Sequence, residues 1–432
     1  MHAPAVRSFL RLRIARCALA LVAMGGCDGM EGPPVDAGAP RDAATRDAAG
    51  RDGGEVDDAG GLDGGASMDG GSAGADGGPP GTDCAAMACY YVREGASGDG
   101  SSWASAFPAL PPTLVRGATY FVAAGTYPAY TFDDALDGTR RITIKRALEG
   151  DHGTAEGWDS TYGMGQATFD STLVFESGHY VLDGQVRDEA DWFDGTAYGF
   201  RVAHAGRDQN IVIARYGISI DDVSIRYVFV DAIVGDLPAT TIRRYAIDTD
   251  GFDGGSTATG LVFHRMFVRG SNNVWFLRTT DGAVVEYSAS DGAQSNDANH
   301  GEIVNLYYSG ENAVIRYNQF RNAFITGGGG TALVAITQAD GLRFYGNVSY
   351  DFRVGDGAVG FDGYSSSHNR IHHNTFVHNR GYNAGFVFGS GTDNLAYNNL
   401  WVDGGWCASR ARTTTTRSAT ETREARATHR PA

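Results

Sequence analysis

The stretch Ile315-Arg316-Tyr317-Asn318 sets the pattern of this chain, because its form returns three more times downstream. The later copies are FYGN (344–347), IHHN (371–374) and LAYN (395–398), and weaker copies upstream are VFHR (262–265) and VEYS (285–288). From IRYN onward, the closing asparagines follow one another at intervals of 29, 27 and 24 residues. A repeat of this length is typical of an array in which one structural unit stacks on the next.

Apolar and mostly polar positions alternate within these phrases. The first position holds Val262, Val285, Ile315, Phe344, Ile371 and Leu395, and the second holds Phe263, Glu286, Arg316, Tyr345, His372 and Ala396. This period of two indicates strands with one buried face. Turns rich in Gly, Asp and Ser separate the strands, without an amphipathic helical pattern between them. We therefore predict an all-β fold, a right-handed parallel β-helix, which is a solenoid.

The asparagines that close the phrases predict a second feature of the stack. Coils of such a solenoid lie about 4.8 Å apart, so Asn318, Asn347, Asn374 and Asn398 are placed to form a side-chain amide ladder. The alternative is that they contact a ligand. By the same alignment, His264 and His373 are predicted to be core or turn residues.

The N-terminus predicts export. Residues 1–27 carry four arginines, a short apolar run at 17–23, and then MGGC at 24–27. The last four residues resemble the lipobox of bacterial lipoproteins, which implies lipid attachment at Cys27; an ordinary cleaved secretory peptide is the alternative. The apolar run is too short to span a bilayer. We expect an extracytoplasmic protein, anchored to the bacterial membrane by lipid alone and displayed at the cell surface.

Two segments lack the composition of a folded core. Residues 28–83 hold 13 acids, three arginines and otherwise mainly Ala and Gly, which predicts a disordered linker acting as a stalk. Residues 408–432 are rich in Arg and Thr, with no aliphatic side chain larger than Ala. This segment is predicted to be a disordered basic tail, and a frameshift that truncated the original β-helix is the other interpretation.

The N-terminal part of the folded region carries a family resemblance. YYV (90–92), GDGSSWASAF (98–107), GATYFVAAGTY (117–127) and RITIKRA (141–147) resemble the opening of bacterial surface β-helix proteins of the pectate-lyase-like superfamily. The resemblance covers roughly residues 90–406 and implies a β-helix domain within 84–407. It also implies an N-terminal cap, into which residues 103–107 lead. The nearby Cys84 and Cys89 are predicted to form a disulfide in an oxidising compartment, with two free thiols as the alternative.

The column of second positions is the first candidate site. Glu286, Arg316, Tyr345 and His372 are predicted to face solvent on successive coils. The resemblance implies that relatives cleaving acidic polysaccharides by β-elimination need a cation or metal for the uronate carboxylate and a base for the C5 proton. The column supplies those residue types. The alternative is a solvated face with one ion pair.

Two other groups are weaker candidates. His300 and Glu302, on the turn entering 303–307, are predicted to form an acid–base pair or else to cap a strand end. The segment Ala246–Ser256 is predicted to be a loop whose Asp248, Asp250 and Asp253 could ligate calcium. Their spacing does not follow the EF-hand pattern.

Charge narrows the classes of partner. The net charge is −16; setting aside the signal (+4), the linker (−10) and the tail (+4) leaves −14 for residues 84–407. An acidic folded region argues against a nucleic-acid partner. We expect a monomer that binds an extracellular polysaccharide and cleaves it as a lyase or a glycosidase. The alternative is a non-catalytic surface protein, adhesive or acting as a spacer.

Overall fold

The computed structural model describes Cys84 and residues 88–204, 209–214, 218–232, 245–249, 257–270, 273–293, 301–308, 310–322, 324–325, 332–351, 353–354, 359–377, 383–388 and 391–402. These residues all belong to one compact unit, Ser72–Ala432. The predicted signal peptide with Cys27, the linker 28–83 and the tail 408–432 lie outside the described residues.

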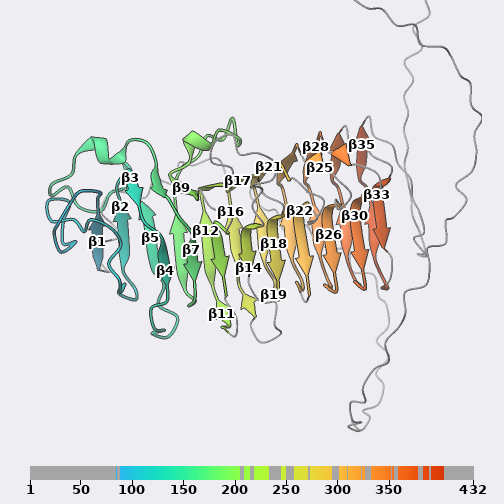
Figure 1. Ribbon diagram of the computed structural model, residues 1–432, viewed down its shortest axis with the longest axis horizontal. Coiled ribbons are helices and arrows are strands. Elements are labelled where there is room, and N and C mark those ends of the chain that lie inside the picture. Colours follow the sequence, from blue (N-terminus) through green and yellow to red (C-terminus); the bar gives the residue numbers. More distant parts are fainter. Residues whose placement is uncertain are drawn as a thin grey trace, which may run out of the picture. The chain divides into compact units, whose positions relative to one another are not determined.

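Three long parallel sheets, here called A, B and C, make up the described part of the chain, and successive turns of chain add strands to them in that order (Figure 1). Sheet A contains β1 (Cys89–Val92), β2 (Thr119–Val122), β5 (Ile142–Arg146), β8 (Tyr180–Asp183), β12 (Val223–Arg226), β16 (Val262–His264), β20 (Val284–Glu286), β23 (Val314–Arg316), β27 (Arg343–Tyr345), β31 (Arg370–His372) and β34 (Leu395–Tyr397). Sheet B contains β3 (Gly125–Tyr127), β6 (Ala167–Phe169), β9 (Phe200–Ala203), β13 (Val228–Asp231), β17 (Phe267–Arg269), β21 (Ala289–Asp291), β24 (Gln319–Arg321), β28 (Val348–Tyr350), β32 (Thr375–Val377) and β35 (Leu400–Val402).

Sheet C closes each coil. It contains β4 (Tyr130–Phe132), β7 (Leu173–Phe175), β10 (Ile211–Ile213), β14 (Tyr245–Thr249), β18 (Asn273–Arg278), β22 (Glu302–Tyr307), β26 (Ala332–Thr337), β30 (Val359–Tyr364) and β33 (Asn383–Phe388). The shorter elements are β11 (Ile220–Asp221), β15 (Ala258–Thr259), β19 (Thr280–Asp281), β25 (Phe324–Ile325), β29 (Arg353–Val354) and the 3-10 helices η1 (Ser160–Gly163) and η2 (Gly195–Ala197). The predicted right-handed parallel β-helix is confirmed.

One continuous core fills the interior of the coils. The inward side chains of sheet A on five consecutive coils are Phe263, Val285, Ile315, Phe344 and Ile371, and each is 0% exposed. Burying an apolar side chain of this size contributes roughly 1.5–3 kcal/mol relative to leaving it in water. Because each coil buries its apolar face against the next, the stack as a whole holds the strands in register.

The corner between sheets A and B has a repeating backbone conformation. In each coil from β16 onward, the residue that follows the sheet A strand has a positive φ, between 50° and 67°. These residues are Arg265, Tyr287, Tyr317, Gly346, His373 and Asn398. The left-handed conformation costs a non-glycine residue about 1–2 kcal/mol, so the neighbouring coils must compensate for it.

The asparagine ladder supplies that compensation. The main-chain N–H and Nδ2 of Asn318 both donate to Oδ1 of Asn347 at 3.0 Å. Asn347 donates in the same way to Asn374, at 3.0 and 3.1 Å, and Asn374 to Asn399, at 3.1 and 2.9 Å. The predicted ladder is therefore confirmed for Asn318, Asn347 and Asn374.

The predicted alignment of the last phrase is wrong by one residue. Ile371 pairs with Ala396 and not with Leu395, so Asn399 joins the ladder in place of Asn398. Two successive apolar residues and two successive asparagines make this phrase ambiguous, because a shift of one residue exchanges the two faces of a strand. Main-chain pairing with β31 fixes the register instead.

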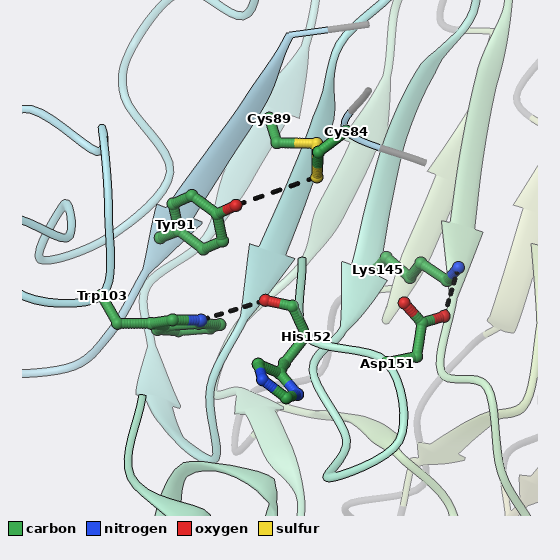
Figure 2. The surroundings of a disulfide bond; sticks show 7 residues. All are labelled: Cys84, Cys89, Tyr91, Trp103, Lys145, Asp151 and His152. Carbon is green, nitrogen blue, oxygen red and sulfur yellow. Dashed lines mark hydrogen bonds and ion pairs between the residues drawn. A yellow bond between two sulfur atoms is a disulfide. The ribbon is translucent and has the colours of Figure 1, made fainter. Parts of the chain in front are cut away.

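The N-terminal end carries a cap and a disulfide. Cys84 and Cys89 form the predicted bridge, beside the ring of Tyr91 (Figure 2). Trp103 is 0% exposed, packs 5.0 Å from Tyr91 between ring centroids, and donates from Nε1 to the carbonyl of His152 at 3.0 Å. The buried indole anchors the loop that follows β1. Of the segment that the resemblance assigns to the cap, Phe107 and Leu110 pack against the main core, whereas Trp103 belongs to a separate cluster with Tyr91 and Phe121.

The predicted loop at 246–256 is wrong in its first part, because β14 runs from Tyr245 to Thr249. Its five residues are all buried, and they pair with β10 on one side and β18 on the other. The high content of Asp and Gly further along concealed this strand from sequence reasoning. Within the described ranges, no helix has the length and apolarity needed to cross a membrane.

Candidate functional site

Strand register brings the four predicted column residues together. Glu286, Arg316, Tyr345 and His372 pair in sequence across β20, β23, β27 and β31 on the outer face of sheet A. The register adds Tyr397 of β34 at the far end, opposite His372. Neighbouring members stand one strand spacing apart, about 4.8 Å.

The same register adds His264 at the near end and corrects its predicted position. Phe263, and not Val262, pairs with the buried Val285, so His264 lies opposite Glu286 and faces outward. His264 was predicted to be a core or turn residue because two apolar residues precede it and leave the register open. We call His264, Glu286, Arg316, Tyr345, His372 and Tyr397 the polar column.

Glu286 lies between two nitrogen partners. Its Oε1 is 3.1 Å from Nδ1 of His264, and its Oε2 accepts from Nε and Nη2 of Arg316 at 2.8 and 2.6 Å. Arg316 Nη1 also donates to the hydroxyl of Tyr345 at 3.1 Å. The hydrogen bond to Tyr345, and then the carboxylate of Glu286, raise the pKa of Arg316 above its usual value. Arg316 is therefore a fixed cation and not a base.

The far half of the polar column is aromatic. The rings of Tyr345 and His372 stack with centroids 5.0 Å apart and planes within 4°, and His372 stacks on Tyr397 at 4.9 Å and 13°. Stacking fixes the orientation of the His372 ring and turns ring edges toward solvent. Burial lowers the pKa of His372, and the adjacent His373 lowers it further. His372 is therefore uncharged at neutral pH.

A hydrogen-bonded chain fixes the tautomer of His372. With the amide nitrogen of Asn398 assigned to the side that faces His373, Nδ2 donates to Nε2 of His373 at 3.3 Å. The proton of His373 is then on Nδ1, which lies 2.8 Å from Nδ1 of His372 and donates to it. His372 consequently carries its own proton on Nε2 and offers an N–H donor at its outer edge.

His264 is also uncharged. Its side chain is 26% exposed, and burial lowers its pKa, although the charge of Glu286 opposes this shift. The adjacent Arg265 also lowers the pKa of His264, and Arg265 lies 3.4 Å from Glu189 in the loop that follows β8. Near neutral pH, the two charges of the polar column are those of Glu286 and Arg316, which cancel.

The corner residues and one loop border the polar column. Tyr287 and Tyr317 are 37% and 42% exposed, and their rings stack at 5.2 Å. Arg187, from the loop between β8 and β9, donates to the carbonyl of Tyr287, and its guanidinium lies 4.0 Å from the ring centroid of Trp192. Phe193 of the same loop packs against Phe267 of sheet B. The loop therefore forms a wall beside the near half of the column.

A second outward column runs two residues before the polar column on each strand. It consists of Ser224, Val262, Val284, Val314, Arg343, Arg370 and Leu395, paired in that order. The three valines are half-buried, and sequence reasoning missed this column because it assigned Val262 and Leu395 to the core. We call Val262, Val284 and Val314 the valine column.

The other predicted site residues lie elsewhere. Glu302 begins β22 on sheet C and is 2% exposed, so it does not join the polar column; His300 lies outside the described residues. Asp248 on β14 is fully buried and accepts from Arg278 Nη2 at 2.8 and 2.9 Å. Asp250 and Asp253 lie outside the described residues, so calcium binding there stays a prediction. Among the residues described, no three His, Cys, Asp or Glu side chains cluster to hold a metal ion.

A cleft of about 710 Å³ was not predicted. It is lined by Gly117, Ala118, Thr139, Arg140, Arg141, Thr143, His179 and Asp222. Asp222 accepts from Arg141 at 2.7 and 2.6 Å, and its Oδ2 is 2.8 Å from Nδ1 of His179. In the sequence, this cleft could have been recognised from one feature: His179 and Asp222 each directly precede a sheet A strand. The charged side chains that line the cleft are already paired, Arg141 with Asp222 and Arg140 with Asp137 outside the cleft.

The sheets and the site together define the class of this protein, a parallel β-helix with a polar and aromatic column on one sheet. No family model matches the chain, and no curated protein matches it in sequence. Among solved structures, it is similar to the GH136 lacto-N-biosidase from Eubacterium ramulus, with 13% identity over 73% of this chain and 68% of that one and a TM-score of 0.36. It is also similar to pectate lyase Pel9A, with 13% identity over 76% of this chain and 82% of that one and a TM-score of 0.31. Neither similarity carries information about activity.

Proposed function

We propose that this protein binds an extracellular polysaccharide along the outer face of sheet A. The observation that supports this most is the polar column, in which six side chains on consecutive coils contact one another and expose hydrogen-bonding edges. Their repeat of about 4.8 Å is close to the length of one sugar unit in an extended chain. A repeating ligand can therefore make the same kind of contact on each coil.

The chemistry of the column favours binding over cleavage. Hydrolysis of a glycosidic bond uses two carboxyl groups that flank it, and Glu286 is the single carboxylate of the polar column as defined. Elimination from a uronate needs a cation that can pair with the sugar carboxylate. The charge of Arg316 is already taken up by Glu286, 2.6 Å away. A non-catalytic, glycan-binding surface protein fits these contacts best.

Export and display belong to the same proposal. Residues 1–27 would direct secretion, Cys27 would carry the lipid, and residues 28–83 would hold the β-helix away from the membrane. Mass spectrometry of the mature N-terminus tests this step. An unmodified N-terminus that does not begin at Cys27 would overturn the lipid anchor without affecting the glycan-binding surface.

The binding test uses the purified full-length protein and a panel of polysaccharides, with co-sedimentation for insoluble glycans and affinity electrophoresis for soluble ones. Tyr345→Ala combined with His372→Ala should abolish binding. The matched control is Tyr364→Ala, which removes a tyrosine that is 59% exposed on sheet C. Binding that survives the double substitution, or that is absent from every glycan with folded protein, contradicts the proposal.

A further inference from the structure

We propose that the ligand is an uncharged polysaccharide whose sugar rings lie with their apolar faces on the valine column, while their hydroxyls face the polar column. This inference rests on the proposed function and specifies its ligand class. It follows from two features of sheet A: an apolar strip beside a hydrogen-bonding strip, and charges that are compensated within the protein.

The side chains of the valine column lie on the outer face of sheet A, opposite to the core. Val262, Val284 and Val314 pair across β16, β20 and β23, and each is half-buried, while Phe263, Val285 and Ile315 beside them are 0% exposed. Side chains two residues apart on a strand share a face, so the valine and polar columns run side by side. The three valines thus give the outer face of sheet A a narrow apolar strip beside the hydrogen-bonding groups of the polar column.

Hexose rings match a surface of this kind. The axial C–H groups of a pyranose form an apolar face, and its hydroxyls project around the ring edge. On sheet A, the apolar strip would take the C–H face, and Glu286, Arg316 and the Tyr345 hydroxyl stand at the edge as donors and acceptors. His372 adds a donor through Nε2, as its tautomer requires.

Charge on this face is compensated pair by pair. Glu286 pairs with Arg316 at 2.6 Å, Asp183 with Arg226 at 3.0 Å, and Asp393 with Arg370 at 2.7 Å. The exposed Arg343 is the exception, since the described part of the chain gives it no ion pair. A polyanion could pair with Arg343. To form any further ion pair on this face, it would have to displace a carboxylate of the protein from its arginine.

The bordering loop adds negative charge. Asp188, Glu189, Asp191 and Asp194 stand in the segment that begins at Arg187, and Arg187 is tied to Glu189 at 2.8 Å. Asp188, Asp191 and Asp194 accept from main-chain N–H groups of their own loop at 2.8 to 2.9 Å, and Glu189 is 53% exposed on its side chain. The field beside the near half of the column is therefore negative, which disfavours the approach of uronate or sulfated chains.

The test measures binding of full-length protein to cellulose, chitin, xylan and β-1,3-glucan, against polygalacturonate and alginate, at low and high salt. We expect binding to at least one uncharged glycan, unchanged by salt, and no binding to the polyanions. Val284→Thr with Val314→Thr should weaken binding of the uncharged glycan about tenfold. Each change replaces by a hydroxyl one methyl group that the bound glycan would bury. Val348→Thr is the matched control, because Val348 is 37% exposed on sheet B.

The outcomes separate the two proposals. Salt-sensitive binding of polyanions alone, abolished by Arg343→Gln, overturns the uncharged ligand and leaves glycan binding intact. Failure to bind any glycan overturns both. Concentration-dependent self-association in light scattering, lost in the double valine variant, would assign the strip to a second copy of the chain and also overturn the inference.

Discussion

The guanidinium of Arg316 and the carboxylate of Glu286 lie on adjacent strands with Nη2 and Oε2 2.6 Å apart, and the same carboxylate contacts His264 on the coil before. Three coils are thus joined through one acid. Since burial lowers the pKa of His264 while Glu286 raises it, the presence of Arg316 beside Glu286 influences the pKa of His264 indirectly.

Removal of Arg316 should raise the pKa of His264. In Arg316→Met, the negative charge of Glu286 loses its strongest partner and acts more fully on the imidazole. Glu286→Gln should have the opposite effect and lower the pKa of His264 further. NMR titration of the imidazole protons measures both shifts. Because the ion pair is partly exposed, each change should alter the unfolding free energy by less than about 1 kcal/mol. Shifts of the same sign in both variants would contradict the network.

Acidification should destabilise the fold through two histidines. The folded pKa values of His264 and His372 lie below the ordinary 6.5, so the unfolded chain binds protons first as the pH falls. Their contribution to stability is therefore complete above that value and is lost as pH falls toward the folded pKa values. In His264→Gln with His372→Phe, the unfolding free energy should depend less on pH between about 7 and 5. Val348→Thr, which changes no titratable group and lies on sheet B, is the control and should keep the wild-type dependence.

Loss of a ladder asparagine should be costly. Asn347→Ala removes the acceptor of the Asn318 N–H and the donor to the carbonyl of Ile315, both in a buried corner. Two unpaired buried groups should lower the unfolding free energy by about 2–4 kcal/mol, measured by urea denaturation. Asn398→Gly, one residue outside the ladder, exposed and at a positive φ that glycine adopts freely, should cost less than about 0.5 kcal/mol. Equal costs would show that the ladder contributes nothing specific.

The tautomer of His372 should depend on Asn398. Nitrogen NMR of the imidazoles is expected to show the proton of His372 on Nε2 and that of His373 on Nδ1. Asn398→Ala should release both rings into mixtures of tautomers. In His373→Asn, the new asparagine tolerates the positive φ, and the His372 ring should also become a mixture of tautomers. A His372 signal that is already mixed in the unmodified protein would be incompatible with this chain of hydrogen bonds.

Much of the fold could be predicted from local pattern. Alternation around Ile315 and Phe344 was sufficient to place Arg316 and Tyr345 on one outer face, and strand register confirms that placement. Their role in binding stays a prediction. The fold could be predicted because burial of one strand face requires the same alternation of apolar and polar residues in every coil.

Register was the part that the sequence left open. At Val262-Phe263 and Leu395-Ala396, two apolar residues adjoin, so alternation alone allows either face. The resulting one-residue errors hid the outward positions of His264, Tyr397 and Val262. The β14 strand was missed for a related reason, because its Asp248 is stabilised in burial by Arg278, a residue distant in sequence.

The ladder makes each coil an interchangeable length of surface. Asn318 and Asn347 are 29 residues apart and occupy equivalent corners, so removing residues 319–347 would place Asn318 directly beside Asn374. The polar column would lose Tyr345 of β27 and shorten by one strand, about 4.8 Å, without a new junction geometry, while the valine column would keep its length. Insertion of a coil at the same place would lengthen the polar column by the same step. Under the proposed function, the number of coils sets how many repeating units of the polysaccharide the polar column can contact.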